Sequence, residues 1–437
     1  METSVVIIGA GFSGSLTALN LLSNPPTDRD LQVTLIDPRG SFGPGLAYTV
    51  PSDRFKLNVR AKAMGAFPHD PQAFLRWLRE RDPSISADDF VSRRYYGEYL
   101  KELVHEMSRA RPASLSLVTG EVVDVLPKIN SSGFEVLFAD STRKEADCVV
   151  LAVGNILRRA VGTCEVEQIL REPYDPESYS DLSRAHKIFI LGSSLTAVDV
   201  ILECEGRGFS GSYTVVSRNG RFPLPHQDPA SLPSANLPTN WEAPGTALNL
   251  MRLIRSESRR CGSSQPVFDA MRPRIQEMWG NLSLEQRRAF LRHARPFWEI
   301  HRHRIPAEHY ATLTKLQASS RLTILAGKVA HFKTGEAYIR RRKSGTETVH
   351  FDIGFMCAGP EGNIGSIQHP LMRNLIKHGL IEPGPLRLGI AGNSPERSPG
   401  FYVVGPLDKE RLWENTAVRE LREQAAQVAS LITGSSS

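Results

Sequence analysis

The sequence predicts an α/β protein of two doubly wound, Rossmann-like, three-layer domains, with a discontinuous first domain and a helical insertion in the second. The first observation behind this prediction is a strand–turn–helix–strand order at residues 4–37 that returns at residues 187–217. The second is a pair of similar apolar segments ending in glycine, residues 148–154 and 353–359. We expect these two segments where the chain crosses between the domains.

The first unit begins with an apolar strand at residues 4–8 and turns through Gly9-Ala10-Gly11-Phe12-Ser13-Gly14 into a helix. The first glycine of such a motif allows the tight turn, the second lets the backbone approach a pyrophosphate, and the third lets helix and strand pack closely. An acid ends the second strand about 20 residues later, where a carboxylate takes the ribose hydroxyls. The alternative, a purely structural turn, explains fewer of these features. The expected dinucleotide-binding residues are Gly9, Gly11, Ser13, Gly14 and Asp37.

The second unit carries a weaker motif, in which Ser194 replaces the middle glycine after Gly192, and Thr196 follows. Its second strand ends in Arg218, with Arg221 nearby, and carries no acid. A guanidinium there pairs with a 2′-phosphate, which favours NADPH over NADH. The alternative is a solvated arginine at the end of a strand.

The domain boundaries follow from these two units and the crossing segments. We expect an FAD-binding domain at residues 1–165 and 346–437, and a NAD(P)H-binding domain at residues 166–345. Residues 246–314 are helical and basic in composition, so they form the expected insertion. Ligands bind outside the carboxyl ends of parallel strands, so both nucleotides are expected at that edge of their sheets.

Composition limits the class of protein and its partners. The chain has 437 residues, of which 41% are hydrophobic and 23% charged, as in an ordinary globular protein. A net charge of +6 is compatible with anionic ligands but is too dilute to indicate nucleic acid. Five widely spaced cysteines argue against a disulfide framework and a zinc site. No signal peptide or membrane span is visible, so the cytoplasm is the expected location and no membrane partner is expected.

Several further segments, taken together in this order, carry a resemblance. They are Gly43-Pro44-Gly45-Leu46-Ala47-Tyr48-Thr49, Leu57-Asn58-Val59, Phe74-Leu75-Arg76-Trp77-Leu78, Ser217-Arg218-Asn219-Gly220, Phe290-Leu291-Arg292-His293, Gly405-Pro406-Leu407 and Trp413-Glu414-Asn415-Thr416-Ala417. With the two glycine turns, they make the chain similar to the two-dinucleotide flavoproteins, and among them to the hydroxylase-like FAD/NAD(P)-binding proteins that resemble amino-acid N-hydroxylating monooxygenases. The resemblance spans nearly the whole chain and is not specific for a substrate.

The resemblance implies FAD at the first site and NADPH at the second, with Gly154 and Gly359 at the ends of the crossing strands. It also implies that Tyr48 and Asn58 lie near the isoalloxazine, as catalytic candidates; a loop tyrosine and a turn-capping asparagine are the alternatives. Wider relatives place an aspartate after the late glycine, whereas proline follows Gly405 here. Thr416 precedes the last helix, whose N-terminal dipole would favour a reduced flavin.

The expected chemistry follows from the cofactors and from what the sequence lacks. A disulfide reductase of the dithiol type needs two neighbouring thiols, and no Cys-x-x-Cys pair is present. The patterns of a hydrolase elbow and of common metal sites are also absent. The expected enzyme is an FAD- and NADPH-dependent monooxygenase that works through a C4a-hydroperoxyflavin, and the resemblance implies that it hydroxylates a small, amino-acid-like substrate. The alternative is a flavin redox or nucleotide-binding regulatory module that serves a protein partner.

A basic cluster at residues 292–304 is the candidate for contact with a substrate or a phosphate. Arginine binds carboxylates and phosphates with two parallel hydrogen bonds, so Arg295 and Arg304 join the catalytic candidates. The cluster would hold an anionic substrate or the NADPH phosphates; the alternative is a solvated helical face. The oligomeric state stays open.

Overall fold

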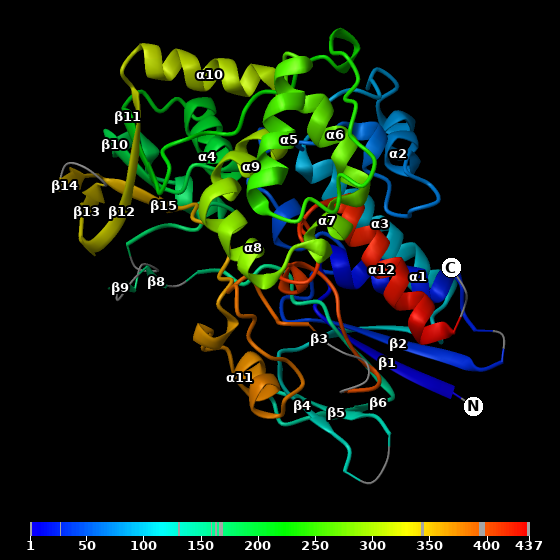
Figure 1. Ribbon diagram of the computed structural model, residues 1–437. Coiled ribbons are helices and arrows are strands. Elements are labelled where there is room, and N and C mark those ends of the chain that lie inside the picture. The colour runs from blue at the N-terminus through cyan, green and yellow to red at the C-terminus, as the bar shows by residue number, and fades with distance from the viewer. Residues whose placement is uncertain are drawn as a thin grey trace. The chain divides into compact units, whose positions relative to one another are not determined.

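The computed structural model describes residues 2–26, 28–129, 132–158, 160–161, 164–165, 169–341, 345–392 and 398–434 (Figure 1). The chain divides into two compact units. The first unit comprises Met1–Thr49, Val59–Ile156 and Glu361–Ser437, and the second comprises Val50–Asn58 and Leu157–Pro360. The chain thus passes between the units just after each of the two crossing strands.

The first unit is built on a five-stranded parallel sheet with the strand order β16-β7-β1-β2-β3. Buried aliphatic runs such as Val5–Ile8 suit the centre of a parallel sheet, which is covered on both faces. The strands are β1 (Glu2–Ile8), β2 (Asp30–Asp37), β3 (Leu115–Thr119), β7 (Cys148–Leu151) and β16 (Phe401–Val403).

Helices form one outer layer of the first unit, where α1 contacts both α3 and α12 (Figure 1). The helices of this unit are α1 (Phe12–Ser23), α2 (Ala73–Arg81), α3 (Arg93–Ala110) and α12 (Val418–Thr433). The other face is covered by a three-stranded antiparallel meander and by α11 rather than by a second helix layer. These elements are β4 (Val122–Pro127), β5 (Phe134–Phe138), β6 (Arg143–Ala146) and α11 (Pro370–Lys377).

The second unit is built on a six-stranded sheet with the order β14-β13-β12-β11-β10-β15, parallel from β12 to β15 and antiparallel beyond. One face packs on α4 (Leu195–Gly206) and α10 (Ala307–Ala318). The long strand β12 has a β-bulge between Val329 and His331. The antiparallel strands β12, β13 and β14 pack over the other face of the sheet. The strands are β10 (Lys187–Leu191), β11 (Ser212–Ser217), β12 (Leu322–Lys333), β13 (Glu336–Arg341), β14 (Gly345–His350) and β15 (Ile353–Met356). A two-residue pair, β8 (Ala160–Val161) and β9 (Cys164–Glu165), follows the first crossing.

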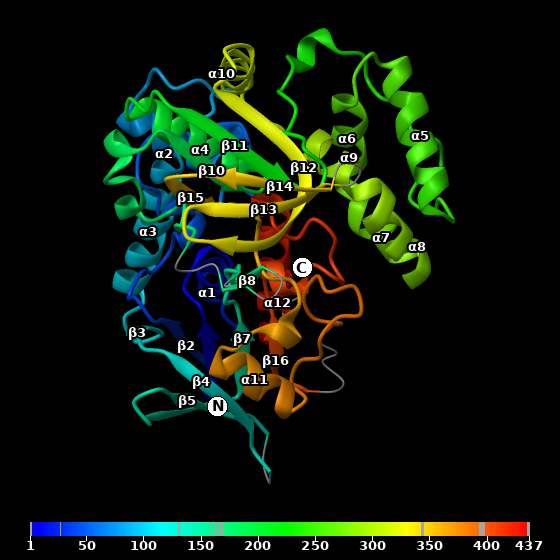
Figure 2. The same cartoon turned by 90° about the vertical axis from the view of Figure 1, so that its left-hand side faces the viewer.

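The helical insertion of the second unit follows β11. Figure 2 shows its helices on one side of the sheet. They are α5 (Ala247–Arg260), α6 (Gln265–Met271), α7 (Ile275–Asn281), α8 (Leu284–Ala289) and α9 (Arg295–Arg302). A π-helical segment, Phe290–Ala294, joins α8 to α9. Such segments are rare and recur at functional sites.

Several boundaries expected from the sequence differ in the structure. The central segment of the first unit ends at Ile156 rather than at residue 165, and Val50–Asn58 belong to the second unit. Residues 346–356 belong to the second sheet, because β14 pairs with β13 and β15 pairs with β10. The expected insertion 246–314 included most of α10, but Leu313 and Leu316 of this helix pack in the core of the nucleotide fold beside β10 and β11. This helix is therefore the crossover that leads into β12, and the insertion ends before it.

Candidate functional site

The two glycine turns share one backbone geometry. Gly9 and Gly192 have φ angles of +103° and +108°, which L side chains rarely adopt. A Cβ at Gly9 would lie 2.4 Å from the carbonyl oxygen of Ala152, and one at Gly192 would lie 2.1 Å from that of Cys357. In each unit the crossing strand therefore passes directly against the turn and excludes any side chain there.

The glycines that end the crossing segments also correspond to each other. Gly154 and Gly359 have φ angles of +69° and +79°, and no atom lies within 4 Å of a Cβ built on either. Because space is open around them, backbone conformation alone explains glycine at both positions. The internal duplication seen in the sequence is thus a duplication of structure.

The second glycine of the motif distinguishes the two turns. Gly11 has extended backbone (φ −72°, ψ −168°), and its Cβ would lie 3.3 Å from the Cα of Gly45. Ser194 holds the equivalent backbone position (φ −92°, ψ −164°) at the start of α4. The loop that carries Gly45 packs closely against the first turn. Glycine at position 11 therefore avoids the crowding that a serine side chain would cause there.

Gly14→Ala is expected to destabilise the first unit by about 3 kcal/mol, at the upper end for an overpacked core. The new Cβ would lie 1.9 Å from the carbonyl oxygen of Gly9, so the helix must move off the strand. Gly154→Ala is the matched control, because it adds only the strain of a positive φ, about 1 kcal/mol. Urea unfolding of the two flavin-free variants measures the difference, and equal losses would contradict this explanation.

The acid at the end of β2 is placed as a ribose-binding carboxylate requires. Asp37 is only 5% exposed, and its Oδ1 accepts hydrogen bonds from the backbone N–H groups of Arg39 (2.8 Å) and Ser41 (3.2 Å). These bonds fix the carboxylate and shape the turn that follows the strand. A carboxylate accepts more than two hydrogen bonds, so acceptor capacity is left for ribose hydroxyls.

Residues from the two ends of the chain meet beside the first turn. A Cβ at Gly405 would lie 3.1 Å from the Oγ of Ser13, and the Gly405 N–H donates to Gln424 Oε1 (2.9 Å). Asn415 is 1% exposed and donates through Nδ2 to the carbonyl oxygen of Gly405 (3.0 Å). Its Oδ1 has no hydrogen-bond partner among the described residues. An orphaned buried acceptor beside a glycine cradle fits a bound dinucleotide with N–H donors, as FAD has.

Thr416 lies just before α12, and its N–H donates to the carbonyl oxygen of Glu414 (2.6 Å). The helix begins at Val418, and Ala417 at its N-cap supplies no side-chain acceptor. The N-cap side chain therefore does not compete for the first N–H groups of α12. The role of Thr416 and of this helix N-terminus toward a flavin stays a prediction.

The two residues expected near the isoalloxazine belong to different units. Tyr48 lies in the first unit, where its ring centroid is 4.8 Å from that of Tyr96 and 6.0 Å from that of Phe12, the first residue of α1. Asn58 lies in the second unit, and its carbonyl oxygen is 3.1 Å from Nε2 of His226. Tyr48 thus adjoins the glycine turn through Phe12. The placement of Asn58 near a flavin stays a prediction.

At the end of β11 three arginines influence one another. Burial, followed by the positive charges of Arg295 and Arg158, lowers the pKa of Arg218, and Glu299 opposes the shift. Arg295 itself donates to Oε1 of Glu299 (2.7 Å). The three guanidiniums bring positive charge together at the end of β11, which suits a phosphate. Sequence reasoning missed Arg158, which follows the first crossing strand, and placed Arg295 with the catalytic residues rather than here.

The remaining residues of the second turn take supporting positions. Arg221 lies with its guanidinium carbon 4.4 Å from the ring centroid of Phe297 in a cation–π contact with the insertion. Its carbonyl oxygen accepts from the Ser193 hydroxyl (2.6 Å), which ties the loop after β11 to the turn. Thr196 Oγ1 lies 3.4 Å from the hydroxyl of Tyr174.

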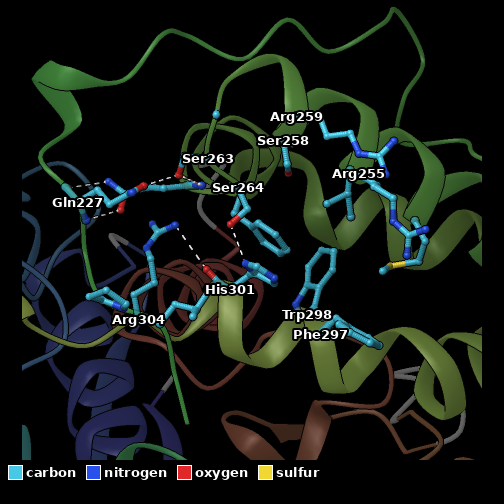
Figure 3. A pocket seen from close by; sticks show the side chains of 17 residues that line it. Gln227, Arg255, Ser258, Arg259, Ser263, Ser264, Phe297, Trp298, His301 and Arg304 are labelled. Atoms are coloured by element: carbon cyan, nitrogen blue, oxygen red, sulfur yellow. Dashed lines mark hydrogen bonds between the residues drawn. The ribbon is translucent and has the colours of Figure 1, made fainter. Parts of the chain in front are cut away.

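Arg304 lines a pocket of the insertion, whereas Arg295 does not (Figure 3). It is 7% exposed, and its Nη2 donates to Oδ1 of Asp269 (2.6 Å). Nearby, His301 Nδ1 lies 2.7 Å from the Ser264 hydroxyl oxygen. Burial, then the charges of Arg304 and Arg221, lowers the pKa of His301, so the imidazole is neutral at neutral pH. The basic cluster seen in the sequence is thus divided between two places.

Other chemistries find no support among the described residues. The four cysteines with described side chains are free. Burial raises the pKa of Cys148 to about 11, and it also raises the pKa values of Cys204 and Cys357. Thiols with raised pKa values are poor nucleophiles. The described part of the chain holds no group of three potential metal-ligating acids, histidines or cysteines. Within it, no helix has the length and apolarity to cross a membrane.

The fold and its paired glycine turns define the class of protein: a two-domain flavoprotein fold with two dinucleotide-binding units. Residues 6–156 match the family described as FAD-NAD(P)-binding. The match confirms the expected cofactor class, FAD with a nicotinamide dinucleotide. No curated protein sequence matches the chain.

Solved structures share the fold over the whole chain. Ornithine hydroxylase from Pseudomonas aeruginosa is 14% identical with a TM-score of 0.67, covering 100% of both chains. The ornithine N-hydroxylase of Kutzneria sp. 744, solved with reduced FAD, NADP⁺ and L-ornithine, is 14% identical with a TM-score of 0.65, covering 99% of both chains. Bacillithiol disulfide reductase from Staphylococcus aureus is 13% identical with a TM-score of 0.59, covering 100% of both chains. At such identities the likeness confirms the fold class expected from the sequence.

Proposed function

We propose that this chain is an FAD- and NADPH-dependent monooxygenase that hydroxylates the amine of a small, amino-acid-like substrate. The observation that carries the proposal is the contrast between the two duplicated turns. The first is followed by a fixed acid, Asp37, and the second by the cationic site around Arg218. An acid suits a ribose with free hydroxyls, as in FAD, and a cationic site suits the 2′-phosphate of NADPH.

When bound, FAD supplies the redox chemistry, and the protein binds, orients and shields the reactants. Gly9, Gly11 and Gly14 would cradle the pyrophosphate, and Asp37 would hold the ribose. The N-terminus of α12, with its positive helix dipole, would face the flavin. Two solved relatives of the same fold carry ornithine hydroxylase in their names, which favours a primary amine as the group hydroxylated here.

Dithiol reductase chemistry is disfavoured, although one relative of this fold is a disulfide reductase. The four described thiols are free and lie in separate elements: Cys148 in β7, Cys204 in α4, Cys261 just after α5, and Cys357 just after β15. A dithiol reductase needs two sulfurs within bonding distance. The remaining alternative is a redox module that passes electrons to a partner.

With ornithine, lysine and acidic amino acids offered in turn, the purified yellow protein should convert one substrate to its hydroxylated amine, with NADPH and oxygen consumed in equal amounts. Mass spectrometry of the product and a peroxide assay measure the coupling. Hydrogen peroxide formed in equal amount to NADPH consumed, with no hydroxylated product from any amine, would overturn the proposal and favour the redox module. A protein that takes up no FAD would overturn both.

A further inference from the structure

The helical insertion encloses a pocket that the proposed cofactor sites do not use. Its volume is about 610 Å³, within the range of small-molecule sites, about 300–1,000 Å³. Helices α5, α6 and α9 and the segment after β11 form its walls. The lining includes Leu224, Met251, Ile254, Phe268, Phe297 and Trp298 as its larger apolar side chains.

One wall of the pocket is a rigid aromatic block. Phe268 and Trp298 are 2% and 1% exposed, and their ring centroids lie 4.9 Å apart in an edge-to-face arrangement. Trp298 packs in turn on Phe290 of the π-helical segment, at 5.3 Å. His301 stacks on Phe268 at 6.0 Å and, being neutral, continues this wall. By contrast Phe297, also in the lining, is 40% exposed. The nearly inaccessible Phe268 and Trp298 therefore brace the wall from behind. The partly exposed Phe297, Met251 and Leu224 are the surfaces that would contact the apolar body of a ligand.

The charged side chains that line the pocket are all arginines. Arg255, Arg259 and Arg304 line the pocket, and none of its lining residues is acidic. Asp269 balances Arg304 from outside the lining. Arg255 and Arg259 form no ion pair with any residue that the structure describes. The pocket therefore attracts an anion at its α5 wall.

Ser258 supplies an unused donor at the same wall. It lies three residues after Arg255 and one before Arg259, so the three side chains share a face of α5. Its Oγ is buried and has no hydrogen-bond partner among the described residues. Figure 3 shows Ser258 and Arg255 on one side of the pocket, and His301 and Arg304 on another, with Trp298 between. A buried hydroxyl without a partner is costly unless a ligand or water completes it.

We propose that this pocket binds a small amphiphilic anion, with its apolar body against Phe297, Met251 and Leu224 and its carboxylate on Arg255, Ser258 and Arg259. The hydroxyl donates one hydrogen bond to the carboxylate, and the two guanidiniums supply charge-assisted bonds. Because the proposal concerns binding, it can be tested independently of the proposed hydroxylation.

Calorimetric titration of the flavin-loaded protein without NADPH tests the site with three probes of equal chain length: octanoate, octanol and octylamine. Octanoate is expected to bind at one site per chain, at least tenfold more tightly than octanol, and octylamine is expected not to bind. Equal affinities for octanoate and octanol, or no binding of octanoate, would overturn the proposal.

Variants assign the binding to this pocket. The double change Arg255→Met and Arg259→Met should weaken octanoate at least tenfold and leave octanol unchanged. Arg252→Met is the matched control, because Arg252 is exposed on the same helix and lies outside the lining. Ser258→Phe fills the pocket without removing a hydrogen bond, and it should abolish binding of both probes while circular dichroism stays unchanged. Octanoate binding unaltered in these variants would place the anion elsewhere and overturn the assignment.

A turnover assay distinguishes the two sources of such an anion. Oxidised product from a bound acid would identify the pocket as a substrate site. A changed rate of NADPH oxidation without product from the acid would identify it as an effector site. Either result supports binding at the pocket only if Ser258→Phe abolishes it, and persistence of the effect in that variant would contradict it.

Discussion

Replacing Arg218 with alanine should raise the Michaelis constant for NADPH by about 10- to 100-fold and leave that for NADH within about twofold. Hydrogen bonds to a charged group contribute about 1.5–3 kcal/mol, and each 1.4 kcal/mol is tenfold in affinity. The lowered pKa of Arg218 reflects its burial first and then the neighbouring charges of Arg295 and Arg158, which a 2′-phosphate would offset. Anaerobic stopped-flow reduction of the flavin by each nucleotide measures both constants.

Arg340→Ala is the control for this experiment, because Arg340 is exposed on β13 of the same sheet. Arg295→Ala separates the two roles considered for that residue. A nucleotide role raises the constant for NADPH, whereas a substrate role changes only the constant for the amine. Parallel losses with NADPH and NADH in Arg218→Ala would show that the 2′-phosphate binds elsewhere.

Gly11→Val should purify with less than about a tenth of the flavin of the unchanged protein, because its side chain would occupy the space that the pyrophosphate needs. The loop at Gly45, 3.3 Å from the added Cβ, needs to move only by tenths of an ångström. Folding should therefore survive where flavin binding does not. Flavin absorbance per chain and thermal unfolding are the two measurements.

The duplicated turn provides a reciprocal control. Ser194→Val makes the corresponding change in the second unit, so it should retain flavin and lose reduction by NADPH. A full flavin complement in Gly11→Val would place the pyrophosphate elsewhere. Loss of flavin in both variants would indicate general damage to the fold.

The glycine turns could be predicted from sequence because their causes are local in each unit. Gly14 must be glycine because the carbonyl oxygen of Gly9, five residues earlier, occupies the place of a side chain. The acid at Asp37 follows from the strand that comes next in the chain. The crossing segments were also recognised, because the ends of β7 and β15 repeat the same apolar pattern and the same glycine.

The domain boundaries were harder to predict, because composition does not indicate which strand a given strand will pair with. The segment after residue 346 looked like a return to the first domain, yet β15 pairs with β10. Helix α10 looked like part of a basic insertion, but the two leucines on its inner face pack on the second sheet. Both outcomes depend on long-range packing, which local pattern does not reveal.

The amino-acid sequence by itself determined the two nucleotide-binding units, since steric exclusion at the glycines and alternating strands and helices act over short stretches of chain. Only the tertiary structure decided which distant side chains share a site. It gathered Arg158, Arg218 and Arg295 into one cationic site and placed Arg304 at a separate pocket. The physical reason is that charge and burial depend on distance in space, and folding sets this distance between residues far apart in the chain.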